Sequence, residues 1–206
     1  MKLVEGTLRD FSDKLASDAP APGGGSAAAL MGALGASLTG MVASLTVGRK
    51  KYAEHEVLMK DVIRRAEDLR LRMLDLIDRD TDAFNMVTGA LALPKDTEDD
   101  KAARSAAMQT ALKACTATPF EMLECSSGTL ELIQEMVGKF NTNAASDLGV
   151  AALSLKASAQ GAWLNVLINL DGIKDEAFVA EHRKAGDELV RKAIALADGI
   201  GNALAD

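Results

Sequence analysis

Apolar side chains recur every three or four residues along almost the whole chain of 206 residues, the spacing of one face of an α-helix. No stretch shows the clear alternation of apolar and polar residues that is typical of a half-buried β-strand. No linker or shift in composition divides the chain. The pattern therefore predicts an all-α fold, a single domain over residues 1–206 built as a bundle of about six or seven helices.

Capping residues and prolines place the ends of these helices. Thr7, Ser26 and either Asp96 or Thr97 are good N-caps for the first, second and fourth helices. Pro119 is expected to break or kink the fourth helix and to open a fifth. The inner face of the first helix is expected to consist of Leu8, Phe11 and Leu15. The expected helices cover about 8–19, 27–47, 54–93, 97–118, 120–137, 146–170 and 175–204.

The second helix carries 21 residues without a charge, from Ala27 to Val47, which is long enough to cross a bilayer. Thirteen of the 21 are Ala, Gly, Ser or Thr, and neither end has a Trp or Tyr. Small residues at Gly32, Ala36 and Gly40 allow another helix to approach closely. We therefore favour a buried helix at the centre of the bundle over a membrane span.

One face of the third helix combines eight apolar residues with a single carboxylate, Asp80. The face comprises Val62, Ala66, Leu69, Met73, Leu76, Asp80, Phe84, Val87 and Leu91. A carboxylate on a core-facing stripe must be paired, hydrogen-bonded or shifted in pKa. Asp80 is therefore a candidate general acid or base, with a structural ion pair or cap as the alternative. Asp78 and Asp82, which flank it, are expected in solvent on this pattern.

The helix expected at 146–170 carries a polar stripe on an otherwise apolar surface. The stripe contains Asp147, Ser154, Ser158, Asn165 and Asn169. Such a stripe lines a wet cavity or makes hydrogen bonds between helices, and the pattern does not distinguish the two.

The loop from Pro22 to Ser26, with Gly23, Gly24 and Gly25 between them, has free backbone N–H groups that suit an anion or a polar heterocycle. No strand precedes it and it lacks the lysine of a nucleotide-binding loop, so taken alone it is a flexible turn. Arg49, Lys50 and Lys51 follow the uncharged helix, where cations complement the helix dipole or bind a carboxylate.

The composition narrows the classes of function. The net charge is −7 and aromatic residues make up 3% of the chain, which disfavours nucleic-acid binding. Cys115 and Cys125 match no metal-ligand spacing and are expected to be reduced and buried. With no secretory segment in evidence at the start, the pattern is typical of a cytoplasmic protein.

Several segments together resemble the formiminotetrahydrofolate cyclodeaminase and methenyltetrahydrofolate cyclohydrolase family. They are "PGGGSAAALMGALGASLTGMV" with "TVGRKKY", "LIDRDTDAF", "LPKDTEDDKAARSAAMQTAL", "SDLGVAAL" and "NVLINL", in order across nearly the whole chain. The resemblance implies an all-helical homodimer that acts on a folate without metal, nucleotide or other cofactor. The acidic composition and the small residues of the uncharged helix lead us to expect that the protein binds neither nucleic acid nor membrane.

The resemblance also assigns roles to individual residues. It implies that Asp80 and Lys50 are catalytic, with Lys50 keeping Asp80 ionised or moving a proton. Residues implied to bind the substrate are Pro22, Gly23, Gly24, Gly25, Ser26, Lys51, Asp78, Arg104, Asn141, Ser146, Asp147, Asn165 and Asn169.

The implied activity is hydrolysis of 5,10-methenyltetrahydrofolate to 10-formyltetrahydrofolate. The alternative is a cyclodeaminase, which releases ammonia from 5-formiminotetrahydrofolate. The absence of a fused transferase segment favours the cyclohydrolase. A helical scaffold without catalytic activity is the alternative from a different class.

Overall fold

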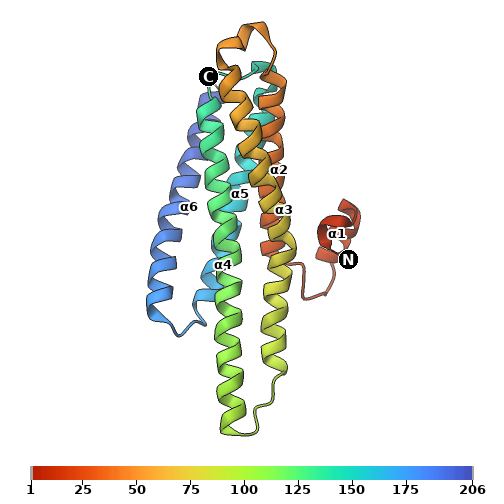
Figure 1. Cartoon of the computed structure of the whole chain (residues 1–206), viewed down its shortest axis with the longest axis vertical. Helices are drawn as coiled ribbons and strands as arrows, with labels where there is room; N and C mark the ends of the chain where they lie inside the picture. The colour runs from red at the N-terminus through yellow and green to blue at the C-terminus, as the bar shows by residue number, and fades with distance from the viewer. Residues whose placement is uncertain (1, 206) are drawn as a thin grey trace.

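The computed structural model describes residues 2–205, which contain six α-helices, three short 3₁₀ helices and no strand (Figure 1). The α-helices are α1 (Leu8–Leu15), α2 (Gly24–Thr46), α3 (Glu56–Ala92), α4 (Glu98–Met136), α5 (Ala145–Leu170) and α6 (Glu176–Ala205). The 3₁₀ helices are η1 (Leu3–Glu5), η2 (Lys50–His55) and η3 (Thr142–Ala144). The prediction of an all-α fold is confirmed.

Helices α2 to α5 form an antiparallel four-helix bundle around one apolar core. Helix α6 packs against α4 and α5, while η1 contacts α3 near the short helix α1. Figure 1 shows that α3 and α4 run on together past the other helices before a loop joins them. The apolar face of α3 that contains Asp80 follows this geometry. Met73 and Leu76 are buried inside the bundle, whereas Phe84 and Leu91 are exposed nearer the end of the helix.

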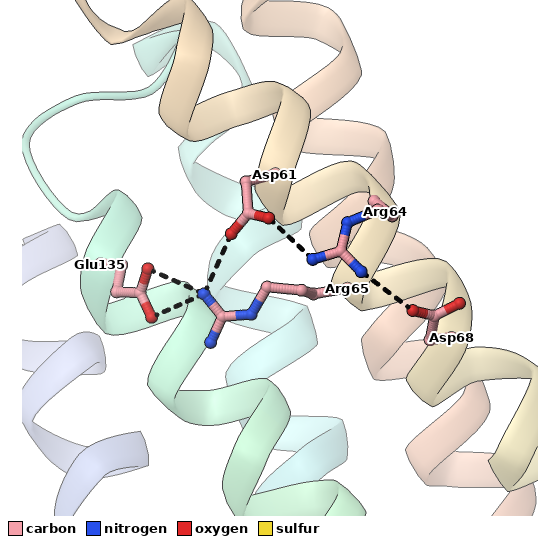
Figure 2. Close-up of polar contacts among 5 residues, drawn as sticks. All are labelled: Asp61, Arg64, Arg65, Asp68 and Glu135. Atoms are coloured by element: carbon pink, nitrogen blue, oxygen red, sulfur yellow. Dashed lines mark hydrogen bonds and ion pairs between the residues drawn. The ribbon is translucent and has the colours of Figure 1, made fainter.

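Ion pairs join α3 and α4 at the end of the bundle where α4 finishes (Figure 2). One Nη atom of Arg65 lies 3.2 Å from Glu135 on α4 and 3.3 Å from Asp61 on its own helix. Arg64 pairs with Asp61 and Asp68 along α3. All of these side chains are at least one-third exposed, so the network fixes the register of the two helices more than it adds stability.

The uncharged helix α2 contacts α3, α4 and α5, as its small residues predicted. At Gly35 a Cβ atom would lie 2.5 Å from Cγ of Leu155 and 3.1 Å from the carbonyl oxygen of Ala151. The helices can therefore pack at this distance only because Gly35 has no side chain. The length and composition of α2 would also allow it to cross a membrane. This is weak evidence for a membrane span, because half of its most apolar window is buried in the bundle.

Three local expectations are wrong. Pro119 does not end a helix but lies buried inside a continuous α4, because packing on several sides outweighs the roughly 3 kcal/mol that an internal proline costs. Ser26 is not the N-cap of α2, which begins at Gly24 with Gly23 as its cap. Leu8 is 75% exposed, because α1 buries little of its surface. Thr7 and Thr97 do cap α1 and α4, each in a capping box.

Substitution of Gly35 tests the close approach of α2 and α5. Gly35→Ala is expected to lower the free energy of unfolding by about 1–3 kcal/mol, because the new methyl group overlaps Leu155 and the backbone of Ala151. Urea denaturation at a fixed protein concentration measures the change.

The matched control is Gly40→Ala on the same helix. Its Cβ would lie 3.7 Å from Cβ of Ala66, an ordinary contact. It should leave stability unchanged or raise it by up to about 1 kcal/mol, because alanine favours a helix. Equal effects at both positions would contradict the proposed packing.

Candidate active site

A cavity of about 310 Å³ lies where the N-terminal end of α2 meets α3, α4 and α5. Its size is that of a small-molecule site, with apolar walls and a few polar groups. The lining residues are Pro20, Ala21, Gly23, Gly24, Gly25, Asp80, Thr81, Phe84, Cys115, Asn165, Ile168 and Asn169. Four segments that are far apart in the sequence thus converge here, as the resemblance implied for the glycine loop, Asp80 and the two asparagines.

The Asp80 carboxylate lies against the first turn of α2. The Ser26 hydroxyl donates to Asp80 Oδ2 at 2.9 Å and lies 3.1 Å from the carbonyl oxygen of Ile77. A Cβ on residue 25 would lie 2.1 Å from Asp80 Oδ1, so only glycine leaves room for the carboxylate. Asp80 therefore sits at the positive end of the helix dipole, which explains why α2 begins before Ser26.

Burial raises the pKa of Asp80 above its usual value of 3.8, and hydrogen bonds from the side chain and backbone of Ser26 oppose the rise. No cation forms an ion pair with Asp80 among the described residues. A carboxylate with a raised pKa in a cavity is suited to accept a proton from a bound water.

Asn169 presents its side-chain oxygen to the site, because both hydrogens of its amino group are used elsewhere, whereas Asn165 keeps one free N–H beside its oxygen. The Asn169 amino group donates to the carbonyl oxygens of Cys115 and Asn165 at 2.9 and 2.7 Å. The Asn165 amino group donates to the carbonyl oxygen of Gly161 at 2.8 Å. Both asparagines line the cavity, so they offer it acceptors for N–H groups of a ligand. Ser158 on the same stripe instead joins helices, donating to Ala28 at 2.7 Å.

Six cavity residues were not among the predicted site residues: Pro20, Ala21, Thr81, Phe84, Cys115 and Ile168. Phe84 follows Asp80 on the same face of α3, which was a usable signal, whereas nothing in the sequence pointed to Cys115 or Ile168. Cys115 is buried, as predicted for both cysteines. Burial and the nearby Asp80 charge raise the pKa of its thiol to about 11, so it stays neutral and forms part of the apolar wall.

The basic element, Arg49 to Lys51, lies at the opposite end of α2 from Asp80. Helix α2 spans 23 residues between them, which separates its ends by about 33 Å. Within one chain Lys50 therefore cannot touch Asp80, and the expected role of Lys50 beside Asp80 stays a prediction that needs a second subunit. Ser146 and Asp147, at the start of α5, share this distant end because α5 runs antiparallel to α2.

The distant end has its own polar hollow of about 290 Å³. It is lined by Arg49, Lys50, Lys51, Tyr52, Asn141, Thr142 and Asn143. The Asn141 amide donates to Thr46 Oγ1 at 2.9 Å, and the Thr142 amide donates to the Tyr52 hydroxyl at 3.2 Å. The hydrogen bonds with Thr142 lower the pKa of Tyr52 to about 8. The predicted site residues thus form two clusters, one at each end of α2.

Asp78 and Arg104 belong to neither cluster. Asp78 turns away from the cavity, and its Oδ1 accepts a hydrogen bond of 2.6 Å from the Leu3 amide. Arg104 lies beyond the bundle on α4, in a shallow surface hollow with Lys101 and Lys174. It is eleven residues from Cys115, so the two share a face of α4 and lie about 16 Å apart.

Comparisons with known proteins assign the chain to a family. The family model described as formiminotransferase-cyclodeaminase matches residues 7–188. The chain belongs to this family.

A methenyltetrahydrofolate cyclohydrolase of Methylorubrum extorquens is 44% identical over 194 residues, which cover 94% of this chain and 93% of the relative. The formimidoyltransferase-cyclodeaminase of Sus scrofa is 36% identical over 93% of this chain, but that match covers only 35% of the longer relative. The crystal structure of a formiminotetrahydrofolate cyclodeaminase from Thermotoga maritima superposes with a TM-score of 0.81 at 31% identity, covering 97% of this chain and 93% of the other.

The Thermotoga maritima protein thus shares nearly the whole helical fold seen here. Among residues 2–205, no group of three or more His, Cys, Asp or Glu side chains is arranged to hold a metal ion. The expectation that the reaction needs no cofactor stays a prediction.

The buried carboxylate makes a prediction about stability. Asp80→Asn is expected to unfold at a higher urea concentration than the wild type near pH 7, because the charged form is the one that burial disfavours. The folded-state pKa lies above the unfolded value, so the wild type gains stability as the pH falls through the folded pKa. The advantage of Asp80→Asn should therefore shrink in acid.

Asp100→Asn is a control of opposite sign. Hydrogen bonds from Thr97 lower the pKa of Asp100, so this substitution should reduce stability near pH 7 and lose its effect in acid. If Asp80→Asn were destabilising at neutral pH, the assigned direction of the Asp80 pKa would be wrong.

Proposed function

We propose that this protein is a methenyltetrahydrofolate cyclohydrolase, which hydrolyses 5,10-methenyltetrahydrofolate to 10-formyltetrahydrofolate. The observation that carries the proposal is the buried Asp80 carboxylate, which forms no ion pair with the described residues of its own chain and lines a cavity of suitable size. The match to a stand-alone cyclohydrolase over 93% of that protein's length supports the same activity. The cyclodeaminase is the second candidate, favoured by the similarity to the Thermotoga maritima protein.

The reacting carbon of the substrate lies between N5 and N10 and shares a positive charge with them. The Asp80 carboxylate stabilises that charge and accepts a proton from water as the water oxygen bonds to the carbon. The tetrahedral adduct then loses its hydroxyl proton as the C=O bond forms, the bond from carbon to N5 breaks, and N5 takes up a proton. One proton is released overall.

The remaining cavity residues fit the binding of a reduced pterin. Its ring carries an amino group and ring N–H donors, which match the acceptor oxygens of Asn165 and Asn169. Phe84 and Ile168 provide apolar contacts beside them. Arg104, on the same face of α4 as the cavity wall, is placed to meet the carboxylates of the glutamate tail.

Asp80→Asn tests the proposed chemistry. It is expected to reduce turnover of methenyltetrahydrofolate by at least about 100-fold, because an amide cannot accept the proton. The decay of methenyl absorbance, corrected for spontaneous hydrolysis, measures turnover, and the urea curves described above show that the variant is folded.

A parallel assay with formiminotetrahydrofolate measures ammonia release. Ammonia release without methenyl hydrolysis by the wild type would favour the cyclodeaminase, and neither activity would favour a scaffold without catalytic function. A folded Asp80→Asn protein with wild-type turnover would exclude Asp80 as the acid–base group.

We further propose that the functional unit is a homodimer formed through the outer faces of α2 and α5. Neither face carries a charge, and large apolar side chains stand exposed along both. They are Leu34, Met41, Leu45, Val150, Leu153, Leu164 and Ile168, between 38% and 73% exposed. An apolar surface of this extent is typical of a protein–protein interface.

The occupant of this surface is a second copy, because a twofold axis through its middle also completes the site. The axis reverses α2, so the N-terminal end of α2 in one subunit faces the C-terminal end in the other. Asp80 then faces the partner's Lys50, and the two polar clusters form one site. Lys50 and Lys51 would keep their predicted roles across the interface, where a cation near Asp80 offsets part, but not all, of the cost of burying its charge.

The same end of the partner subunit would also bring its Asn141, Ser146 and Asp147 into the site. An uncharged face covered by a second subunit also agrees with a location in the cytoplasm and no contact with a membrane. Both stay predictions.

Complementation between subunits tests the shared site. A purified heterodimer of an Asp80→Asn subunit and a Lys50→Met subunit should have about half the wild-type activity, because one of its two sites keeps both groups. Each homodimer should be nearly inactive. If each site lay within one chain, the heterodimer would be as inactive as the homodimers.

Two controls accompany this test. Lys184 is exposed on α6, so a heterodimer of Asp80→Asn with Lys184→Met gives the activity expected from one intact site. Leu164→Glu places a charge in the proposed interface and should yield an inactive monomer in sedimentation. A monomeric wild type with full turnover would contradict the dimer.

A further inference from the structure

The proline inside α4 lies one helical turn from the cavity. Within an α-helix the amide of residue 119 would donate to the carbonyl oxygen of residue 115. Pro119 has no N–H, and its ring crowds the carbonyl four residues earlier. The carbonyl of Cys115 therefore lacks the donor that an α-helix normally supplies, although it lies in the buried wall of the cavity.

A side chain on α5 supplies the hydrogen bond that residue 119 cannot donate. The Asn169 amino group on α5 lies 2.9 Å from the Cys115 carbonyl oxygen, and it also donates to Asn165 at 2.7 Å. Both hydrogens of this amide are thus used on carbonyl oxygens. If the Asn169 side-chain amide were flipped, its oxygen would face two carbonyl oxygens, which cannot donate. The two hydrogen bonds therefore leave the Asn169 oxygen available to the cavity.

We propose that Pro119 is a positioning residue for substrate binding. By withholding its own N–H it leaves the Cys115 carbonyl to the Asn169 amino group, which fixes the Asn169 side chain with its oxygen toward the ligand. The ligand class is a heterocycle with N–H donors, and this part of the inference rests on the proposed function. Pro119 touches no substrate and acts only through Cys115 and Asn169.

Pro119→Ala supplies the missing amide, which then competes with Asn169 for the Cys115 carbonyl. Alanine favours the helix, so the variant is expected to fold. The KM for methenyltetrahydrofolate should rise about fivefold or more while kcat stays within about twofold, because a lost binding contact raises KM without changing the chemical step. If Pro119 were needed only for the shape of α4, Pro119→Ala would change the stability of the protein without raising KM at constant kcat.

A double-mutant comparison isolates the pathway. In an Asn169→Ala background, Pro119→Ala should have no further effect on KM. Asn165→Ala is the matched control, because Asn165 lines the same cavity but its amino group binds Gly161, so Pro119→Ala should keep its effect there. An equal effect of Pro119→Ala in both backgrounds, or no effect on KM in the wild type, would overturn the proposal.

A readout without substrate separates this inference from the proposed function. In NMR spectra of the free protein, Pro119→Ala should shift the side-chain amide resonances of Asn169 and speed their exchange with solvent, while those of Asn165 stay in place. Unchanged Asn169 resonances would overturn the inference even if the enzyme hydrolyses methenyltetrahydrofolate. If the Asn169 resonances shift as expected but the protein does not hydrolyse methenyltetrahydrofolate, only the proposed function would be wrong.

Discussion

The contact between the Asp80 carboxylate and the first turn of α2 is the constraint on which the site depends. A charged group from α3 reaches the helix terminus because residue 25 has no side chain. The Ser26 hydroxyl and backbone then bind the carboxylate, and Gly23 rather than Ser26 caps the helix. The glycine loop thus has a more definite role than that of a flexible turn. It makes room for a carboxylate that is costly to bury and binds it with the positive end of α2.

Much of the fold follows from local rules that a sequence contains. Helical periodicity, the capping boxes at Thr7 and Thr97, and the carboxylate on an apolar face are visible without coordinates. The continuity of α4 through Pro119 is not, because a donor on another helix compensates the lost hydrogen bond and only the tertiary structure brings it there. The separation of Lys50 from Asp80 was within reach of the sequence, since a helix of more than 20 residues already puts its ends about 30 Å apart.

A helix surface without charges, such as that of α2, suits three environments: a membrane, the core of a helical bundle, or an interface between proteins. One side of the helix packs against α3, α4 and α5, while Leu34, Met41 and Leu45 remain exposed on the other. A helix buried on both sides by protein needs no charge anywhere, which explains a composition that also suits a bilayer. In the proposed dimer, assembly and catalysis would share one surface, because the ends of that surface carry the acidic and basic groups.

The antiparallel packing of α2 against both α3 and α5 limits how such a chain can change in length. Adding or removing a turn of α2 would require matching changes in both neighbours, since each small residue faces a particular partner, as Gly35 faces Leu155. The hairpin where α3 and α4 extend past the bundle has no such restriction (Figure 1). Insertions and deletions should therefore be tolerated around the loop after Leu93, while the distance between the two ends of α2 stays constant.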